Sequence, residues 1–349
     1  MREIWNDVEK WRLGGKTAVL ATVVNVSGSS LRPAGSTMAI SSAGEISGSV
    51  TGGCVEGAIF EEAKTVVKTG IPKLVAYGVT DAQAWEVGLS CGGAVRIFVE
   101  DMTSTPWKTI LPALRECIAN NSLAALITVI AGQRLGSKML THRNGNHVGS
   151  LGDEKLNNEL LSRMPTDWAS HDPFEVTLPT DAGEVTAFVD FVVPSPRLVI
   201  VGASHIAIPL VSLAKALDYR TIVVDARSAF ATRERFPHAD ELIVDWPSDA
   251  LNKLHLDAAT CVVCLSHDDK QDVAALLEAL KSEARYIGVL GSKVTQAKRL
   301  EALREEGVDE EHFQRIHGPV GLKIGAKQPA EIAVSIMAEI VATQHGVKA

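Results

Sequence analysis

A long segment near the start of the chain occurs twice, and this internal repeat limits the possible folds more than any other feature. The run at 20–24 recurs 106 residues later, and the glycine-framed segment at 44–50 recurs 101 residues later; Val95–Glu100 matches 185–190, at an offset of 90. Each copy combines short strand-like runs with one helix-like segment, at 55–68 and 154–163. We therefore expect one pseudo-symmetric α/β domain with copies at about 16–100 and 122–190.

Two prolines, Pro194 and Pro196, follow the repeat and mark a domain boundary. Beyond them, short apolar runs alternate with segments of helical period. The expected strands are 198–201, 221–224, 261–265 and 286–290, with helices ending at Leu217, spanning 271–280 and starting at Pro329. Such alternation is typical of a parallel sheet with helices on both faces. The sequence thus predicts an α/β protein with a duplicated domain at 1–195 and a Rossmann-like domain at 197–349.

The charge balance excludes several classes of partner. Lys and Arg total 34 against 42 Asp and Glu, a net charge of -8, which argues against nucleic acid binding. No apolar run approaches the roughly 20 residues of a membrane span, and no basic start precedes an apolar segment as in a secretory signal. The cysteines number five, at irregular spacing, which suggests free thiols. We expect a soluble cytoplasmic protein without a membrane or nucleic acid partner.

The two copies differ in their loops, so the sequence serves as its own control. Copy one continues into Thr51-Gly52-Gly53-Cys54, where copy two has Gly152-Asp153-Glu154-Lys155. In the same way, the segment Ser90-Cys91-Gly92-Gly93 of copy one aligns with Thr180-Asp181-Ala182-Gly183 of copy two. The loop after the first strand of copy one is five residues longer and contains Gly28, Ser29, Ser30 and Arg32. Because copy two manages without these residues, they point to function rather than to folding.

These additions have a common chemistry. A loop rich in backbone N–H groups with one guanidinium suits an anion, and glycine-flanked thiols suit a soft metal or a sulfur carrier. Each residue also has a structural interpretation: the glycines can serve turns, a cysteine can be a small apolar residue, and Arg32 can be a solvated charge. Their joint absence from copy two favours a site. Cys54 and Cys91 are then its candidate metal contacts.

The second domain carries a modified dinucleotide motif. Gly202-Ala203-Ser204-His205 follows the first strand where a Rossmann protein has G-x-G-x-x-G, and Asp225 ends the next strand. His267 follows a later strand at the edge where ligands bind, as a proton carrier, a ligand or a mere capping residue. A possible nucleotide site therefore comprises Gly202, Ser204, His205, Asp225 and His267. Cys261 and Cys264 are three apart on a strand, so we expect them on opposite faces, in the core.

Taken together, these motifs resemble those of the XdhC/CoxI family of xanthine dehydrogenase accessory proteins. The resemblance covers nearly the whole chain. It rests on Gly28-Ser29-Ser30-x-Arg32, Gly52-Gly53-Cys54-Val55-Glu56, Cys91-Gly92-Gly93, Gly202-x-x-His205-Ile206, Arg235-Phe236-Pro237-x-Ala239-Asp240, Tyr286-Ile287-Gly288 and Pro319-x-Gly321-Leu322.

The resemblance implies a chaperone without turnover. Members are thought to bind molybdenum cofactor, as molybdopterin or its dinucleotide form, and to protect it while a cysteine desulfurase supplies the sulfido ligand. They then pass it to an apo molybdenum hydroxylase of the xanthine dehydrogenase type. The copy-one residues, Glu56 included, become the expected cofactor site, and a homodimer is expected.

Two other functions stay open on the sequence. One is an NAD(P)-dependent oxidoreductase that uses Gly202, Asp225 and His267, against which Ser204 counts because the middle glycine normally admits a pyrophosphate. The other is an interaction module that binds partners without any cofactor. Nucleotide binding and molybdenum content distinguish the three.

Overall fold

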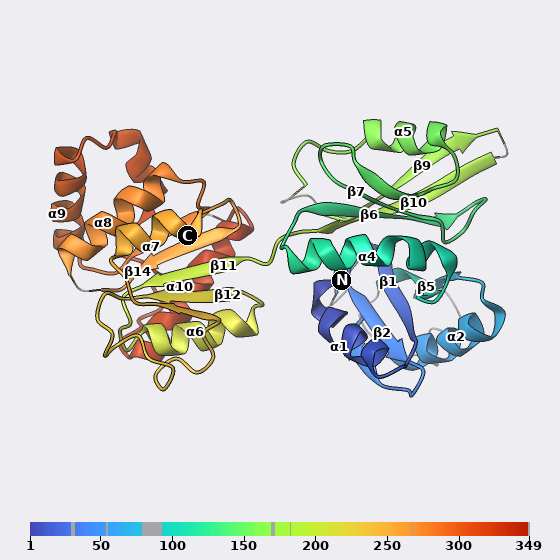
Figure 1. Cartoon of the computed structure of the whole chain (residues 1–349), viewed down its shortest axis with the longest axis horizontal. Coiled ribbons are helices and arrows are strands. Elements are labelled where there is room, and N and C mark those ends of the chain that lie inside the picture. The colour runs from blue at the N-terminus through green and yellow to red at the C-terminus, as the bar shows by residue number, and fades with distance from the viewer. Residues whose placement is uncertain are drawn as a thin grey trace. The chain divides into compact units, whose positions relative to one another are not determined.

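The computed structural model describes residues 1–28, 32–53, 55–78, 93–168, 172–181, 183–266 and 268–347. The chain divides into two compact units, Met1–Pro194 and Ser195–Ala349 (Figure 1). Each unit packs helices against sheets, so the predicted α/β class is confirmed. Among the described helices, none combines the length and the apolar character that crossing a membrane requires.

The first unit consists of two halves with the same sequence of elements. The first half contains α1 (Arg2–Leu13), β1 (Ala18–Ser27), β2 (Thr37–Ser41), β3 (Ile46–Gly48), α2 (Glu56–Thr69), β4 (Lys73–Tyr77) and β5 (Ala94–Asp101). The second half contains α4 (Thr105–Ala119), β6 (Ala124–Ala131), β7 (Lys138–Thr141), β8 (His147–Ser150), α5 (Glu154–Ser162), β9 (Phe174–Thr180) and β10 (Gly183–Val192). Their antiparallel sheets have equivalent orders, β3-β2-β1-β5-β4 and β8-β7-β6-β10-β9.

Each half begins with a helix that the sequence comparison did not include. Helices α1 and α4 match at the offset of 106, which aligns Ile4 with Ile110 and Val8 with Leu114. The two helices share one hydrophobic core with Leu20 of the first sheet and Leu126 of the second. A separate cluster packs α2 on the outer face of the first sheet, and α5 covers the second sheet in the same way. The central strands are therefore buried on both faces, which explains their continuous apolar sequences.

The two halves also contact each other directly and reciprocally. A Cβ on Gly35 would lie 2.8 Å from Pro173 of the other half, and a Cβ on Gly136 would lie 3.0 Å from Pro72. Gly35 and Pro72 correspond to Gly136 and Pro173 at the offset of 101. The sequence repeat is therefore a repeat of structure, whose two copies are related by approximate twofold symmetry.

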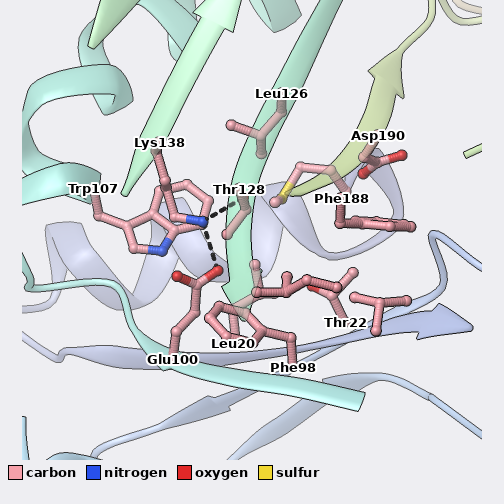
Figure 2. Close-up of a pocket in the computed structure, with 13 residues that line it drawn as sticks. Leu20, Thr22, Phe98, Glu100, Trp107, Leu126, Thr128, Lys138, Phe188 and Asp190 are labelled. Carbon is pink, nitrogen blue, oxygen red and sulfur yellow. Dashed lines mark hydrogen bonds and ion pairs between the residues drawn. The ribbon is translucent and has the colours of Figure 1, made fainter. Parts of the chain in front are cut away.

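A buried ion pair breaks this symmetry (Figure 2). Lys138 Nζ on β7 donates to Glu100 Oε1 on β5 and to Thr128 Oγ1 on β6, each at 2.7 Å, and lies 4.5 Å from the centre of the Trp107 ring. The side chain of Lys138 is 0% exposed and that of Glu100 is 6% exposed. Burial raises the pKa of Glu100 and lowers that of Lys138, and the attraction between the two opposes both shifts.

The symmetry-related position has no such pair. Glu100 corresponds to Asp190 and Lys138 corresponds to Thr37, by the offsets of 90 and 101. The pair therefore favours packing between unlike halves, because two copies of the first half packed together would place Glu100 opposite Thr37. The small cavity beside the pair is lined by matched residues of both halves and measures about 20 Å³, room for a single water molecule. A pterin-sized ligand does not fit there.

The second unit is a parallel α/β sheet. Its elements are β11 (Arg197–Val201), α6 (Ala207–Ala216), β12 (Arg220–Val224), β13 (Glu241–Ile243), α7 (Pro247–Leu254), β14 (Thr260–Cys264), α8 (Asp269–Lys281), β15 (Tyr286–Val289), α9 (Lys293–Glu305), the 3-10 helix η1 (Glu310–Arg315), β16 (Ile316–His317) and α10 (Pro329–Gln344). The strand order is β13-β12-β11-β14-β15-β16, and every pairing is parallel.

Helices cover both faces of this sheet, as predicted. One core contains residues of α6 and α10, and the other contains residues of α7 and α8. Cys261 belongs to the first core and Cys264 to the second, which confirms that the two thiols lie on opposite faces. Burial raises the pKa of Cys261 to about 12 and also raises that of Cys264. These cysteines are core residues.

The ion pair between the halves gives a stability prediction. Glu100→Gln removes the negative charge and leaves Lys138 buried without its anion, so we expect a loss of about 3–5 kcal/mol in the free energy of unfolding. Adding Lys138→Met to this variant should recover most of the loss. Urea unfolding followed by circular dichroism measures both effects. The control is Lys16→Gln, which breaks an exposed pair with Glu45 and should cost about 0–1 kcal/mol. Equal losses in Glu100→Gln and Lys16→Gln would contradict the assigned role.

Candidate functional site

The loops that distinguish copy one all leave the same end of the first sheet. Ser27, the last residue of β1, pairs with Ala94 at the start of β5, and Tyr77, the last residue of β4, pairs with Val95. Gly48, the last residue of β3, pairs with Met38 near the start of β2. The segments 28–36, 49–55 and 78–93, called here the copy-one loops, therefore begin at one end of the sheet. The strand order of the sheet therefore brings together the starts of three loops that are far apart in the sequence.

Several predicted residues lie outside the described part of the chain, namely Ser29, Ser30, Cys54, Cys91 and Gly92. Their described neighbours do belong to this end of the sheet. Gly28 and Gly53 are exposed, whereas Gly93, which precedes β5, is buried.

Glu56, the first residue of α2, organises the loop at 49–55. Its carboxylate accepts seven hydrogen bonds, from the hydroxyls of Ser49 and Thr51 and from the backbone N–H groups of residues 50, 51, 52, 53 and 55, over 2.6 to 3.2 Å. Burial opposes ionisation of this carboxyl, but the hydrogen bonds from Ser49 and Thr51 prevail and lower its pKa to about 2. Glu56 is thus charged at neutral pH.

The equivalent loop of the second half is held by a neutral side chain instead of a carboxylate. Asn157 corresponds to Glu56 at the offset of 101, and its Oδ1 accepts from Leu151 N at 2.9 Å and from Ser150 Oγ at 3.4 Å. A neutral amide is sufficient to hold the shorter turn of copy two. The carboxylate accompanies a longer non-helical turn, since α2 begins at Glu56 whereas α5 begins at Glu154, the equivalent of Gly53, and the longer turn leaves more N–H groups to be bound. The same offset comparison that revealed the loops also identifies this Glu-to-Asn difference.

This arrangement assigns a local role to Gly52 and Gly53. Both backbone N–H groups donate to Glu56, at 3.0 and 2.9 Å, so they point into the loop rather than toward a ligand. Their φ values of 85° and 122° are disfavoured for other residues. The two glycines shape the turn that carries Cys54, and Glu56 holds that turn in place.

Arg32 lies at a different part of this end, over an open pocket of about 310 Å³. Its Nη2 is 2.5 Å from Glu3 Oε2 of α1, with side chains 30% and 46% exposed. The pocket is also lined by Arg2, Gly35, Ser36, Pro173 and Asp190. A guanidinium paired with an exposed carboxylate can exchange that carboxylate for another anion. Sequence reasoning missed Glu3 as a residue of this site, because only the packing of α1 brings it to the loop.

The predicted nucleotide residues of the second unit lie at the carboxyl ends of β11 and β12. Gly202 has a φ of 101°, and a Cβ there would lie 2.6 Å from the backbone of Ser266, so close strand packing requires this glycine. Asp225 accepts a hydrogen bond from Ala203 N at 2.8 Å, which joins it to the turn. His205 is exposed, and His267 is outside the described residues.

The charge of Glu56 leads to a prediction about pH. Because its pKa falls from 4.5 to about 2 on folding, its stabilising effect is complete above pH 4.5 and declines as the pH falls toward 2. We expect Glu56→Gln to lower the free energy of unfolding at pH 7 by about 1–3 kcal/mol, and by less at pH 3.5. Urea unfolding at the two pH values measures this. Glu61→Gln on the same helix removes an exposed partner of Lys64 and is the control; a Glu56→Gln effect no larger than this one, or independent of pH, would refute the assignment.

Comparison with known proteins places this geometry in a family. Residues 11–78 match the XdhC and CoxI family, and residues 198–340 match the XdhC Rossmann domain. The chain is 32% identical over 332 residues to a Bacillus subtilis protein named as a probable xanthine dehydrogenase subunit, covering 95% of this chain and 94% of that protein. It is 27% identical to PaoD of Escherichia coli, named a molybdenum cofactor insertion chaperone, covering 95% and 85% of the two chains.

A solved structure agrees over the full length. The crystal structure of a xanthine dehydrogenase from Bacillus halodurans superposes with a TM-score of 0.80 at 26% identity, covering 100% of this chain and 97% of that one. The two family matches, the extended identity and the shared fold confirm the resemblance drawn from the motifs. The chain belongs to the XdhC and CoxI family.

Proposed function

We propose that this protein is a maturation factor for molybdenum hydroxylases that carries molybdenum cofactor as its cargo. It binds the cofactor at the copy-one loops, protects it while a cysteine desulfurase sulfurates it, and delivers it to an apo enzyme of the xanthine dehydrogenase type. The relative named as a molybdenum cofactor insertion chaperone supports this role. The protein performs no turnover of its own in this proposal and acts in the cytoplasm as a homodimer.

The observation that carries the proposal is the convergence of the copy-one loops at one end of one sheet. Copy two has the same strands and lacks the thiols, the Gly-Gly turn and the five additional residues of the loop that contains Arg32. A fold that is complete without these residues retains them for a ligand. The chemistry of the set, thiols with a guanidinium, suits a cargo that combines a thiophilic metal with a phosphate.

The described contacts divide the work among these residues. The amides of Gly52 and Gly53 donate to Glu56 and are not available to a ligand. The phosphate of the cofactor therefore binds to Arg32 in its open pocket. The thiol of Cys54 or Cys91 is then the contact for molybdenum. In this scheme Glu56 is a positioning residue, because it holds the turn on which Cys54 lies.

The ion pair of Arg32 suits a carrier that must release its load. The side chains of Arg32 and Glu3 are both partly exposed, and such pairs contribute about 0–1 kcal/mol. A cofactor phosphate replaces Glu3 at little cost, and Glu3 replaces the phosphate on release. Exchange of this kind keeps the affinity of the carrier for the cofactor moderate. Transfer to an enzyme that holds the cofactor permanently is then favourable.

Elemental analysis tests the proposal. Purified protein is incubated with freshly released molybdenum cofactor, gel-filtered and analysed for molybdenum per chain. We expect near-stoichiometric metal in the wild type, a loss of about tenfold or more in Cys54→Ala or Cys91→Ala because a thiolate contact is removed, and a smaller loss in Arg32→Ala. Cys117→Ala, which changes a buried cysteine of α4, is the control.

Two results would overturn parts of this scheme. Metal content unchanged in both Cys54→Ala and Cys91→Ala would remove the thiols from the site. Absence of molybdenum from the wild type would leave an interaction module without a cofactor as the better account.

A further inference from the structure

The carboxylate that binds the ribose diol in many Rossmann proteins is occupied here by the protein itself. Asp225, at the end of β12, is 0% exposed. Its Oδ2 accepts from Ala203 N and from Arg227 Nη2, both at 2.8 Å, and its Oδ1 accepts from the backbone N and the Nε of Arg227, both at 2.9 Å. These hydrogen bonds outweigh the effect of burial and lower the pKa of Asp225. A ribose with free hydroxyls would therefore find no exposed oxygen on Asp225 itself.

What this edge of the sheet exposes instead is cationic and aromatic. The guanidinium of Arg227 lies 4.0 Å from the centre of the Phe230 ring, and that of Arg235 lies 5.3 Å from it. The Arg227 side chain is 46% exposed, and Phe230 is 41% exposed. Within the described residues, Arg235 makes no ion pair and donates one of its N–H groups to Phe230 O. Of the two guanidinium groups that contact the Phe230 ring, Arg227 is attracted by the carboxylates of Asp225 and Asp268, whereas Arg235 forms no ion pair within the described residues.

The start of α6 adds a second anion-binding feature beside these arginines. No described side chain caps this helix, and Ser204 Oγ, in the preceding turn, is buried without a hydrogen-bond partner among the described residues. The turn and the arginine are directly connected, because Ala203 N and Arg227 Nη2 bind the same oxygen of Asp225. Uncapped N–H groups, the buried Ser204 hydroxyl and the Arg227 guanidinium thus lie together at the carboxyl ends of β11 and β12.

We propose that this edge binds a nucleotide that carries a phosphomonoester on its ribose, such as a 2′-phosphorylated adenine dinucleotide, and discriminates against the unphosphorylated ribose. The phosphomonoester lies on Arg227 and Arg235, the base stacks on the exposed face of the Arg227–Phe230 pair, and the linking phosphates lie at the start of α6. This site is separate from the copy-one loops, and it does not depend on the maturation role.

The two arginines supply most of the affinity in this arrangement. Ser204 stands where a glycine normally lets a pyrophosphate approach the backbone, so its Cβ weakens the contact with the linking phosphates. A dianionic phosphomonoester between two guanidinium groups forms charge-assisted hydrogen bonds that a hydroxyl does not form. Adenosine 2′,5′-bisphosphate should therefore bind nearly as tightly as the complete dinucleotide.

Calorimetric titration of the full chain with NADP⁺, NAD⁺ and adenosine 2′,5′-bisphosphate tests the inference. We expect NADP⁺ to bind at least about tenfold more tightly than NAD⁺, since only the phosphomonoester forms charge-assisted hydrogen bonds with the guanidinium groups. Arg235→Ala and Arg227→Lys should each reduce this ratio toward unity, mainly by weakening NADP⁺. Arg220→Ala changes an exposed arginine at the opposite end of β12 and should leave the ratio unchanged.

The ratio of the two dissociation constants is insensitive to the fraction of a variant that is folded, since both ligands meet the same sample. If one variant does not fold, the ratio of dissociation constants in the wild type and in the other variant still tests the inference. Equal affinities, a preference for NAD⁺, or binding of none of the three ligands by the wild type would overturn the inference. So would an unchanged ratio in both arginine variants.

Discussion

The first unit depends on the two halves covering each other. Each sheet has one face under its own helix, α2 or α5, and needs the other half and the paired helices α1 and α4 to bury the rest. Neither half would be a stable domain alone, because a sheet with an open apolar face does not stay monomeric in water. The buried pair of Lys138 and Glu100 adds direction to this packing, since it is formed only when the first half supplies the acid and the second supplies the base.

This shared core allows the proposed cofactor site to lie in one half alone. Copy two keeps short turns that need only an amide, Asn157, to hold them. Copy one can carry longer loops at the same end of its sheet because the stability of the unit comes from the shared core. One of those loops, at 49–55, is anchored by the single carboxylate of Glu56.

Carboxylates at Glu56 and Asp225 follow the same principle in different folds. Each lies where a motif suggests ligand binding, and each is bound instead by the N–H groups of the loop beside it. A buried anion surrounded by amides makes a loop rigid, and it also uses up donors that a ligand phosphate would otherwise find. The partly exposed arginines, Arg32 in the first unit and Arg227 with Arg235 in the second, are therefore the groups that we propose bind anions.

The sequence by itself determined the duplication, the α/β class, the opposite orientation of Cys261 and Cys264, and the family. These properties follow from local periodicity and from comparison of the chain with itself, which need no knowledge of neighbours. It missed α1 and α4 as parts of the repeat, because amphipathic helices keep their apolar spacing while the side chains change, as from Trp5 to Leu111.

Only the tertiary structure decided which groups satisfy each buried charge. The partner of Glu100 is 38 residues away on another sheet, that of Arg32 is on α1, and one donor to Asp225, Ala203 N, lies at the end of another strand. Strand order and helix packing set these neighbours, and neither is written in the spacing of any one segment. For that reason the sequence could name the loops of the site, whereas the fold was needed to show which of their polar groups remain for a ligand.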